Sequence, residues 1–251
     1  MNKQTKILGI IPARYESSRF PGKPLARIND KPMIQWVFEG CEAVFEYLIV
    51  ATDDIRIKQE VESFGGNAIL TSPDHACGTE RCEEALGIME ERHGEIFESV
   101  INIQGDEPLI RNEQLNELLK LITSNNAQIA TLAAKFEDEE CPEDPNIIKL
   151  ILNKDQQALY FSRAPIPYIR DAESKINDQY LKHIGLYAYK SKVLKQICRL
   201  PVSVLEKAEA LEQLRWLENG FQIQVGFTTY KNIGIDTPGD ISKLKKYLNR
   251  S

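Results

Sequence analysis

The residues best suited to chemistry lie in one short segment, IPARYESSRFPGKPL, which begins at Ile11. Arg14, Arg19 and Lys23 can each donate charge-assisted hydrogen bonds to phosphate oxygens, and Gly22 permits backbone conformations that a side chain would forbid. The segment follows an apolar run typical of a buried strand, and ligands of open α/β sheets bind beyond the carboxyl ends of strands. We interpret it as a loop that binds a phosphorylated ligand; a solvated surface loop is the alternative.

Two acidic turns follow strand-like runs elsewhere in the chain. Asp106 stands in the segment NIQGDEP, and Asp236 stands in the segment GIDTP. Magnesium prefers oxygen ligands and is commonly held by one or two carboxylates together with phosphates. The two aspartates and the basic loop therefore predict a polyphosphate bound with Mg2+. The structural alternatives are an N-cap for Asp236 and a turn residue for Asp106 beside Gly105.

A second group of polar residues lies in the segments YFSRAPIP, HIGLYAY and LEQLR. They suit a carboxylated, polyhydroxylated ligand, because a guanidinium can pair with a carboxylate while Glu and Gln bind hydroxyl groups. The candidates are Arg163, His183, Tyr187, Glu212 and Gln213. Structural alternatives stay open: His183 as a satisfied core histidine, Tyr187 as a packed strand residue. Glu212 could be one end of a helix-surface pair with Arg215.

Apolar runs that alternate with amphipathic stretches must position these residues. The predicted strands span 7–11, 47–52, 68–70, 99–103, 129–133, 147–152, 185–189 and 223–227. The predicted helices span 32–44, 54–64, 79–92, 112–124 and 238–249, with Thr79 or Asn112 as N-cap. This alternation predicts an α/β fold with a layered, mainly parallel sheet. The rhythm changes after residue 135, where a polar break at 153–156 is typical of a hairpin turn.

Composition narrows the class of protein. The 251 residues are 42% hydrophobic, enough for one large domain or a domain with an insertion. A formal net charge of -6 argues against a nucleic-acid partner, which requires a broad basic face. Five cysteines without C-x-x-C spacing and an N-terminus without a secretory signal predict reduced thiols and a cytoplasmic location. No apolar run approaches the roughly 20 residues that cross a bilayer, so we expect no membrane insertion.

Together these segments resemble the 3-deoxy-manno-octulosonate cytidylyltransferases, also called CMP-Kdo synthetases. The segments ATDD, CGTER and IDTP extend the resemblance over nearly the whole chain. PGKPL alone is shared with other sugar nucleotidyltransferases, whereas its combination with QGDEP, YFSRA and LEQLR is more specific. The resemblance implies a Rossmann-like, three-layer α/β/α fold of the nucleotide-diphospho-sugar transferase type, with a mixed, mainly parallel sheet and a smaller dimerisation subregion. Residues 1–251 would form a single nucleotidyltransferase domain, in which 1–135 mainly bind the nucleotide and 136–251 bind the sugar and form a homodimer.

The resemblance also implies a reaction. CMP would pass from CTP to the anomeric oxygen of 3-deoxy-D-manno-octulosonate (Kdo), giving pyrophosphate and CMP-Kdo for lipopolysaccharide biosynthesis. The catalytic residues would be Arg14, Lys23, Asp106 and Asp236, of which the two aspartates would hold Mg2+. The nucleotide-binding residues would be Pro12, Ala13, Arg14, Arg19, Lys23, Gly78, Thr79, Arg81, Gln104 and Gly105. The sugar-binding residues would be Arg163, His183, Tyr187, Glu212 and Gln213.

Two other functions stay open. An enzyme of the same superfamily could act on a sialic acid or on an amino analogue of Kdo. A non-catalytic nucleotide-sugar sensor would keep the fold but would have no need for Lys23, Asp106 and Asp236 together. Two residues depart from the family pattern: Cys77 stands where serine is common, and Gly239 stands where an acidic residue is usual. We expect Gly239 to weaken the start of the last helix, since a favourable charge near the helix dipole is missing.

Overall fold

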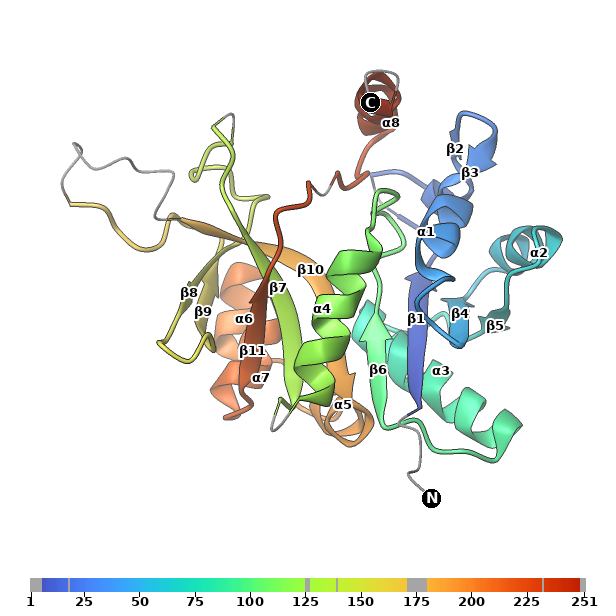
Figure 1. Ribbon diagram of the computed structural model, residues 1–251, viewed down its shortest axis with the longest axis horizontal. Coiled ribbons are helices and arrows are strands. Elements are labelled where there is room, and N and C mark those ends of the chain that lie inside the picture. Colours follow the sequence, from blue (N-terminus) through green and yellow to red (C-terminus); the bar gives the residue numbers. More distant parts are fainter. Residues whose placement is uncertain are drawn as a thin grey trace. The chain divides into compact units, whose positions relative to one another are not determined.

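The computed structural model describes residues 6–17, 19–124, 127–138, 140–170, 180–231 and 233–248. The chain forms two compact units: unit 1 contains Met1–Asn116 and Lys231–Ser251, and unit 2 contains Glu117–Tyr230. In Figure 1, unit 1 therefore includes both the blue start and the dark red end of the chain. Because the chain returns to unit 1 at its end, Asp236 belongs to the same unit as Lys23 and Asp106.

Unit 1 is built on parallel strands in the order β6, β1, β4, β5. These strands are β1 (Ile7–Ala13), β4 (Tyr47–Thr52), β5 (Ala68–Leu70) and β6 (Ser99–Asn102). In the register of the sheet, Ile10 of β1 lies beside Ile49 of β4 and Asn102 of β6. The carboxyl end of β1 is thus flanked by the carboxyl ends of two neighbours, which is where parallel sheets bind ligands.

The helices of unit 1 are α1 (Met33–Cys41), α2 (Ile55–Ser63), α3 (Gly78–His93), α8 (Pro238–Leu248) and the short 3-10 helix η1 (Lys23–Leu25). A small hairpin joins β2 (Arg27–Ile28) to β3 (Lys31–Pro32). The N-cap of α3 is Cys77, so the predicted cap at Thr79 is wrong. The Glu80 carboxylate, in the first turn of α3, accepts the N–H of Ala76, the residue before the N-cap, at 2.8 Å.

The start of α8 shows how the chain compensates for Gly239. The carboxylate of Asp240, the next residue, accepts the backbone N–H of Thr237 at 2.9 Å and its hydroxyl at 2.8 Å. Burial raises the pKa of Asp240, but bonds from Lys243 and Thr237 outweigh burial and lower it to about 2. The first turn of α8 therefore carries a negative charge at Asp240.

Unit 2 contains a mixed set of strands. β11 (Ile223–Phe227) lies parallel to β7 (Ile129–Lys135), which pairs antiparallel with β10 (Leu181–Lys190). β10 pairs with β8 (Lys149–Leu152), and β8 forms a hairpin with β9 (Ala158–Ser162). Its helices are α4 (Asn112–Thr123), which begins in unit 1, α5 (Ser191–Ile197), α6 (Val204–Glu209) and α7 (Glu212–Glu218). A Cβ at Gly226 of β11 would lie 2.8 Å from Leu121, so glycine permits the close approach of α4.

The predicted α/β architecture, with a mixed, mainly parallel sheet and helices on both sides, is confirmed. Each predicted strand has a counterpart, and the polar break at 153–156 does join β8 to β9. The sequence analysis set no bounds for the strand after this break, β9, and missed the β2–β3 hairpin and the short helices α5, α6 and α7. Within the described part of the chain, every helix is too short or too polar to span a bilayer. The dimerisation subregion and the functional division at residue 135 stay predictions.

Candidate functional site

The loop after β1 contains a backbone conformation, at Gly22, that only glycine readily adopts. The N–H of Gly22 donates to the carbonyl of Tyr15 at 2.8 Å, which closes the loop just before Lys23. Gly22 has φ 68° and ψ 16°, in the left-handed region. A Cβ on Gly22 would also lie 3.2 Å from the Tyr15 ring. Glycine therefore sets the turn that brings Lys23 back to the edge of the sheet.

Lys23 lies between the two predicted acidic turns. Its Nζ is 2.6 Å from Oδ2 of Asp106 and 3.6 Å from Oδ1 of Asp236. Nη2 of Arg19 also donates to Oδ1 of Asp236, at 3.0 Å. The backbone links the two turns directly, because the N–H of Ile235 donates to the carbonyl of Asp106 at 2.9 Å. The expected convergence of the basic loop and both aspartates is confirmed.

The carboxylate of Asp236 does not cap α8. It contacts Arg19 and Lys23, while the backbone N–H and hydroxyl of Thr237 are bound by Asp240. The N-cap alternative for Asp236 is therefore wrong, and Asp240 fills that structural role. Asp236 is available for charge chemistry at the sheet edge.

A cavity of about 270 Å3 opens between the basic loop, the acidic turns and the start of α3. All the predicted nucleotide-binding residues line it except Thr79, which is buried in the first turn of α3. Gly105 has a specific reason to be there, since a Cβ would lie 2.9 Å from the carbonyl oxygen of Pro12. The absent side chain lets the QGDEP turn meet the end of β1. Arg14, Arg19 and Lys23 make this cavity suitable for an anion.

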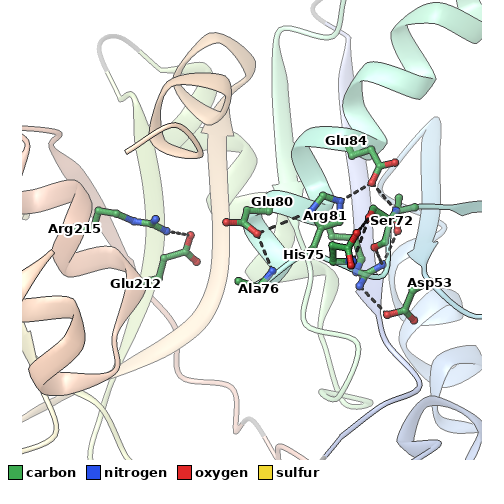
Figure 2. A network of polar contacts seen from close by, with 11 residues as sticks. Asp53, Ser72, His75, Ala76, Glu80, Arg81, Glu84, Glu212 and Arg215 are labelled. Carbon is green, nitrogen blue, oxygen red and sulfur yellow. Dashed lines mark hydrogen bonds and ion pairs between the residues drawn. The ribbon is translucent and has the colours of Figure 1, made fainter. Parts of the chain in front are cut away.

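Arg81 lines the cavity but is held by an internal network, shown in Figure 2. Its side chain is 4% exposed, and Nη2 lies 2.9 Å from Oδ2 of Asp53. Nη1 donates to the Thr71 hydroxyl at 2.6 Å and to the Ser72 carbonyl at 3.3 Å. The other oxygen of Asp53 accepts the N–H of Tyr15 at 3.4 Å. The Asp53–Arg81 pair thus connects the basic loop to the segment that precedes α3.

Two carboxylates of α3, those of Glu80 and Glu84, hold the segment that precedes this helix (Figure 2). Glu84 accepts the N–H of Ser72 at 2.8 Å and is hydrogen-bonded to Nε2 of His75. Burial raises the pKa of Glu84, but the bonds from Ser72 and His75 outweigh burial and lower it. His75 and Ala76 line the cavity as a result. The sequence reasoning missed them and Asp53, although each follows a predicted strand end, which was a usable signal.

The candidate sugar-binding residues all lie in unit 2. Arg163 donates to three backbone carbonyls: Nε to Glu209 at 2.6 Å, Nη1 to Pro145 at 2.8 Å and Nη2 to Ala210 at 3.3 Å. These bonds use three of the five guanidinium N–H groups, which leaves donors for a ligand carboxylate. The predicted binding role of Arg163 is untested by these contacts and stays a prediction.

Glu212 and Gln213 begin α7. Oε1 of Glu212 accepts a bond from Nη2 of Arg215 at 2.9 Å, as Figure 2 shows, so the helical pair expected as the structural alternative exists. Nε of Arg215 also lies 3.3 Å from Glu206. Gln213 is buried. The pair orients Glu212 without excluding a ligand contact, and the sugar-binding roles of Glu212 and Gln213 stay predictions.

His183 is a half-buried, neutral histidine. Its Nε2 lies 2.9 Å from Oγ1 of Thr131, and this oxygen also lies 2.7 Å from the Leu186 carbonyl and 3.2 Å from the Ile184 carbonyl. Because both carbonyls can only accept the Thr131 hydroxyl proton, this geometry favours Nε2 as the donor to Thr131. Burial lowers the pKa of His183 to about 3. These contacts agree with the structural alternative, a satisfied histidine of the core. A ligand role for His183 is untested.

Tyr187 packs beside His183, with ring centroids 5.2 Å apart. Its hydroxyl is buried and has no hydrogen-bond partner among the residues that the structure describes. Burial raises the pKa of Tyr187, so the phenol stays protonated and can donate. An unpaired buried hydroxyl is costly, and a ligand hydroxyl would satisfy it. The indole N–H of Trp216 is unpaired in the same way, so the sugar-binding role of Tyr187 stays a prediction.

The titration of His183 predicts a loss of stability in acid. Unfolded His183 binds a proton near pH 6.5, whereas the folded ring binds it only near pH 3. Below pH 6.5 the unfolded state holds more protons, so the free energy of unfolding should fall by about 1.4 kcal/mol per pH unit between about pH 6 and pH 4. Urea unfolding at several pH values measures this slope. The variant His183→Asn should lose this pH dependence of the free energy of unfolding, whereas His93→Asn, which replaces an exposed histidine, should keep it. An unchanged slope in His183→Asn would show that His183 is not the group that titrates.

The chain is similar to known proteins over almost its whole length. A family model described as cytidylyltransferase matches residues 8–226. A 3-deoxy-manno-octulosonate cytidylyltransferase of Parabacteroides distasonis is 50% identical over 250 residues, which cover 97% of this chain and 98% of the relative. That of Thermodesulfovibrio yellowstonii is 49% identical over 248 residues, with coverage of 96% and 97%. The solved structure of a CMP:2-keto-3-deoxy-manno-octonic acid synthetase complexed with CTP is 42% identical, with a TM-score of 0.88 and coverage of 98% and 99%.

Proposed function

The chain belongs to the cytidylyltransferase family and, within it, to the 3-deoxy-manno-octulosonate cytidylyltransferases, and we therefore propose that it transfers CMP from CTP to Kdo. The products are pyrophosphate and CMP-Kdo, the activated sugar for lipopolysaccharide biosynthesis. One observation links this proposal to particular residues: Lys23, Asp106 and Asp236 meet at a cavity that the basic loop lines.

The cations of the basic loop suit a displacement at phosphorus. In the proposed reaction, the anomeric oxygen of Kdo attacks the α-phosphorus of CTP in line with the departing pyrophosphate. Protein groups contribute mainly position and charge in such transfers. Arg14 and Lys23 would neutralise charge on the α-phosphate and on the leaving group. Arg19 would bind the outer phosphates, since its guanidinium is exposed beside Asp236.

The two aspartates fit a magnesium ion. Both carboxylates approach one positive group, the Lys23 ammonium, and this supports a cation site between them. No cluster of three or more His, Cys, Asp or Glu side chains suited to a metal occurs among the described residues. Asp106 and Asp236 would therefore hold Mg2+ together with phosphate oxygens and water, as is usual for this ion. When bound, Mg2+ polarises phosphate oxygens and makes a coordinated hydroxyl more acidic.

Asp236→Asn tests the metal role. The amide keeps the size of the side chain but removes one ligand charge, so we expect about a tenfold higher magnesium concentration at half-maximal activity. The measurement is a magnesium titration of initial rates at saturating CTP and Kdo. Asp54→Asn is the control, because it removes a carboxylate of the same unit that caps α2 and does not line the cavity. Equal titrations for Asp236→Asn and the unmodified protein would contradict the assignment.

Pyrophosphate release tests the function itself. Mixed with CTP, Mg2+ and Kdo, the protein should release pyrophosphate, and omission of either substrate should abolish release. Release of pyrophosphate with an amino analogue of Kdo or with a sialic acid, and not with Kdo, would show that this other acid is the substrate. Binding of CTP without release for any sugar acid would instead support a sensor. The homodimer and the cytoplasmic location stay predictions.

A further inference from the structure

Lys149 of β8 is a buried cation without a carboxylate partner among its hydrogen bonds. The residue is 0% exposed, and its Nζ donates to the carbonyls of Asp144 at 2.9 Å, Ile147 at 2.7 Å and Arg163 at 2.5 Å. These three bonds use all three ammonium donors. Burial of a charge is costly, and an apolar side chain in the same space would often be no less stable. The three carbonyl bonds of Lys149 are therefore contacts that an apolar residue could not supply.

Arg163 extends the same arrangement. Its guanidinium binds the carbonyls of Pro145, Glu209 and Ala210, as described above. Lys149 and Arg163 together donate hydrogen bonds to backbone carbonyls of the segment 144–147, of the end of β9 and of the end of α6. We name these two cations and the carbonyls that they bind the carbonyl cluster. The Glu209 carboxylate joins it by accepting the Ser162 hydroxyl at 2.7 Å and the N–H of Arg163 at 2.9 Å.

The carbonyl cluster holds the backbone just before α7. Ala210 has φ 50° and ψ 48°, a left-handed conformation that costs a residue with a Cβ about 1 kcal/mol. The bond from Arg163 to the Ala210 carbonyl helps to stabilise this turn. Leu211 follows as the N-cap of α7, and Glu212 and Gln213 are the first two residues of the helix. The candidate sugar-binding side chains of α7 thus take their position from the carbonyl cluster.

We propose that Lys149 is a positioning residue of the sugar-acid site. Its bond to Arg163 is made to the backbone carbonyl, so it fixes that residue while the guanidinium stays free to share donors with a ligand. Through Arg163 it also fixes the turn at Ala210 and the start of α7. This inference rests on the proposed function, because Kdo is the ligand that Arg163, Glu212 and Gln213 would bind.

Lys149→Met is the test, with Lys182→Met as its matched control. Lys182 lies directly opposite Lys149 in the β8–β10 ladder and is also buried. Its ammonium instead pairs with Glu140 at 2.6 Å and with Glu137 at 3.7 Å, outside the carbonyl cluster. Both substitutions remove one buried ammonium at paired positions, and Lys182→Met also leaves Glu140 without its ion-pair partner, so the control is not the milder change. The two variants therefore differ mainly in the carbonyl cluster.

We expect Lys149→Met to raise the KM for Kdo about tenfold, because a displaced binding group of this kind costs about 1.4 kcal/mol or more. The KM for CTP should stay within about twofold, and Lys182→Met should leave both constants within about twofold of the unmodified protein. All rates are measured well below the Tm of each variant. A lower Tm with an unchanged KM for Kdo would make Lys149 merely structural, and an equal rise in both constants would indicate general damage; either result overturns the proposal.

Hydrogen exchange separates this inference from the proposed function. The backbone amides of residues 209–216 should exchange faster in Lys149→Met and at the normal rate in Lys182→Met, whatever the substrate is. If the unmodified protein released no pyrophosphate with Kdo, the proposed function would fail while this readout still decided the positional role. Unchanged amide exchange of residues 209–216 in Lys149→Met would overturn the positional role of Lys149. Should Lys149→Met fail to fold, Glu209→Gln weakens the same cluster with little change in volume and should give the same split in KM.

Discussion

Lys23→Met is expected to lower turnover about one hundred- to one thousandfold, the usual effect of removing one preorganised charge donor from an active site. The ammonium is only 15% exposed and lies 2.6 Å from Asp106. It is therefore held in place before substrate binds, and its charge would act on the transferring phosphate. The KM for CTP should change less, because Arg14 and Arg19 also line the cavity.

Steady-state rates with varied CTP and saturating Kdo measure this effect. Lys31→Met provides the control, since Lys31 is a lysine of the same unit that pairs with Glu39 at 2.7 Å and does not line the cavity. It should keep normal turnover. Normal turnover in Lys23→Met would show that this lysine takes no part in the reaction.

Arg81→Met is expected to lower the free energy of unfolding by about 3 to 5 kcal/mol, the typical cost of breaking a buried ion pair from one side. The substitution leaves the Asp53 carboxylate, which is 14% exposed, without its guanidinium. It also removes the bonds to Thr71 and Ser72 that hold the segment before α3. The KM for CTP should rise in parallel, because the basic loop and this segment would separate.

Urea unfolding monitored by circular dichroism measures this loss. Arg56→Met is the matched control in the same unit. Arg56 pairs with Asp54, the neighbour of Asp53, but its side chain is 54% exposed. Exposed pairs contribute at most about 1 kcal/mol, so this variant should be nearly as stable as the unmodified protein. Equal stability losses in the two variants would contradict the structural role of the Asp53–Arg81 pair.

The meeting of Lys23 with Asp106 could be predicted because both residues follow strand-like runs, whereas Asp236 was placed by its position just before a helix start. Parallel strands end at one edge of a sheet, so strand-end residues converge even when they are far apart in sequence. The Asp53–Arg81 pair was not predictable in the same way. Arg81 lies inside α3, and its partner depends on how that helix is placed against the end of β4.

Unit 2 was harder to predict for two physical reasons. Its helices α5, α6 and α7 have six or seven residues each, too few for a helical repeat to stand out. Lys149 was missed because its partners are backbone carbonyls, which leave no mark in a sequence. In contrast, the pair of Glu212 and Arg215 follows from helical spacing alone and was foreseen as a structural alternative.

The structure of the protein crystallised with CTP and Mg2+ tests the central claim most directly. We predict that the triphosphate occupies the cavity beside the basic loop, with Lys23 about 3 Å from a phosphate oxygen and the metal ion between Asp106 and Asp236. A nucleotide bound elsewhere, or phosphates beyond the reach of Lys23 and both aspartates, would contradict the proposed cytidylyltransfer at this site.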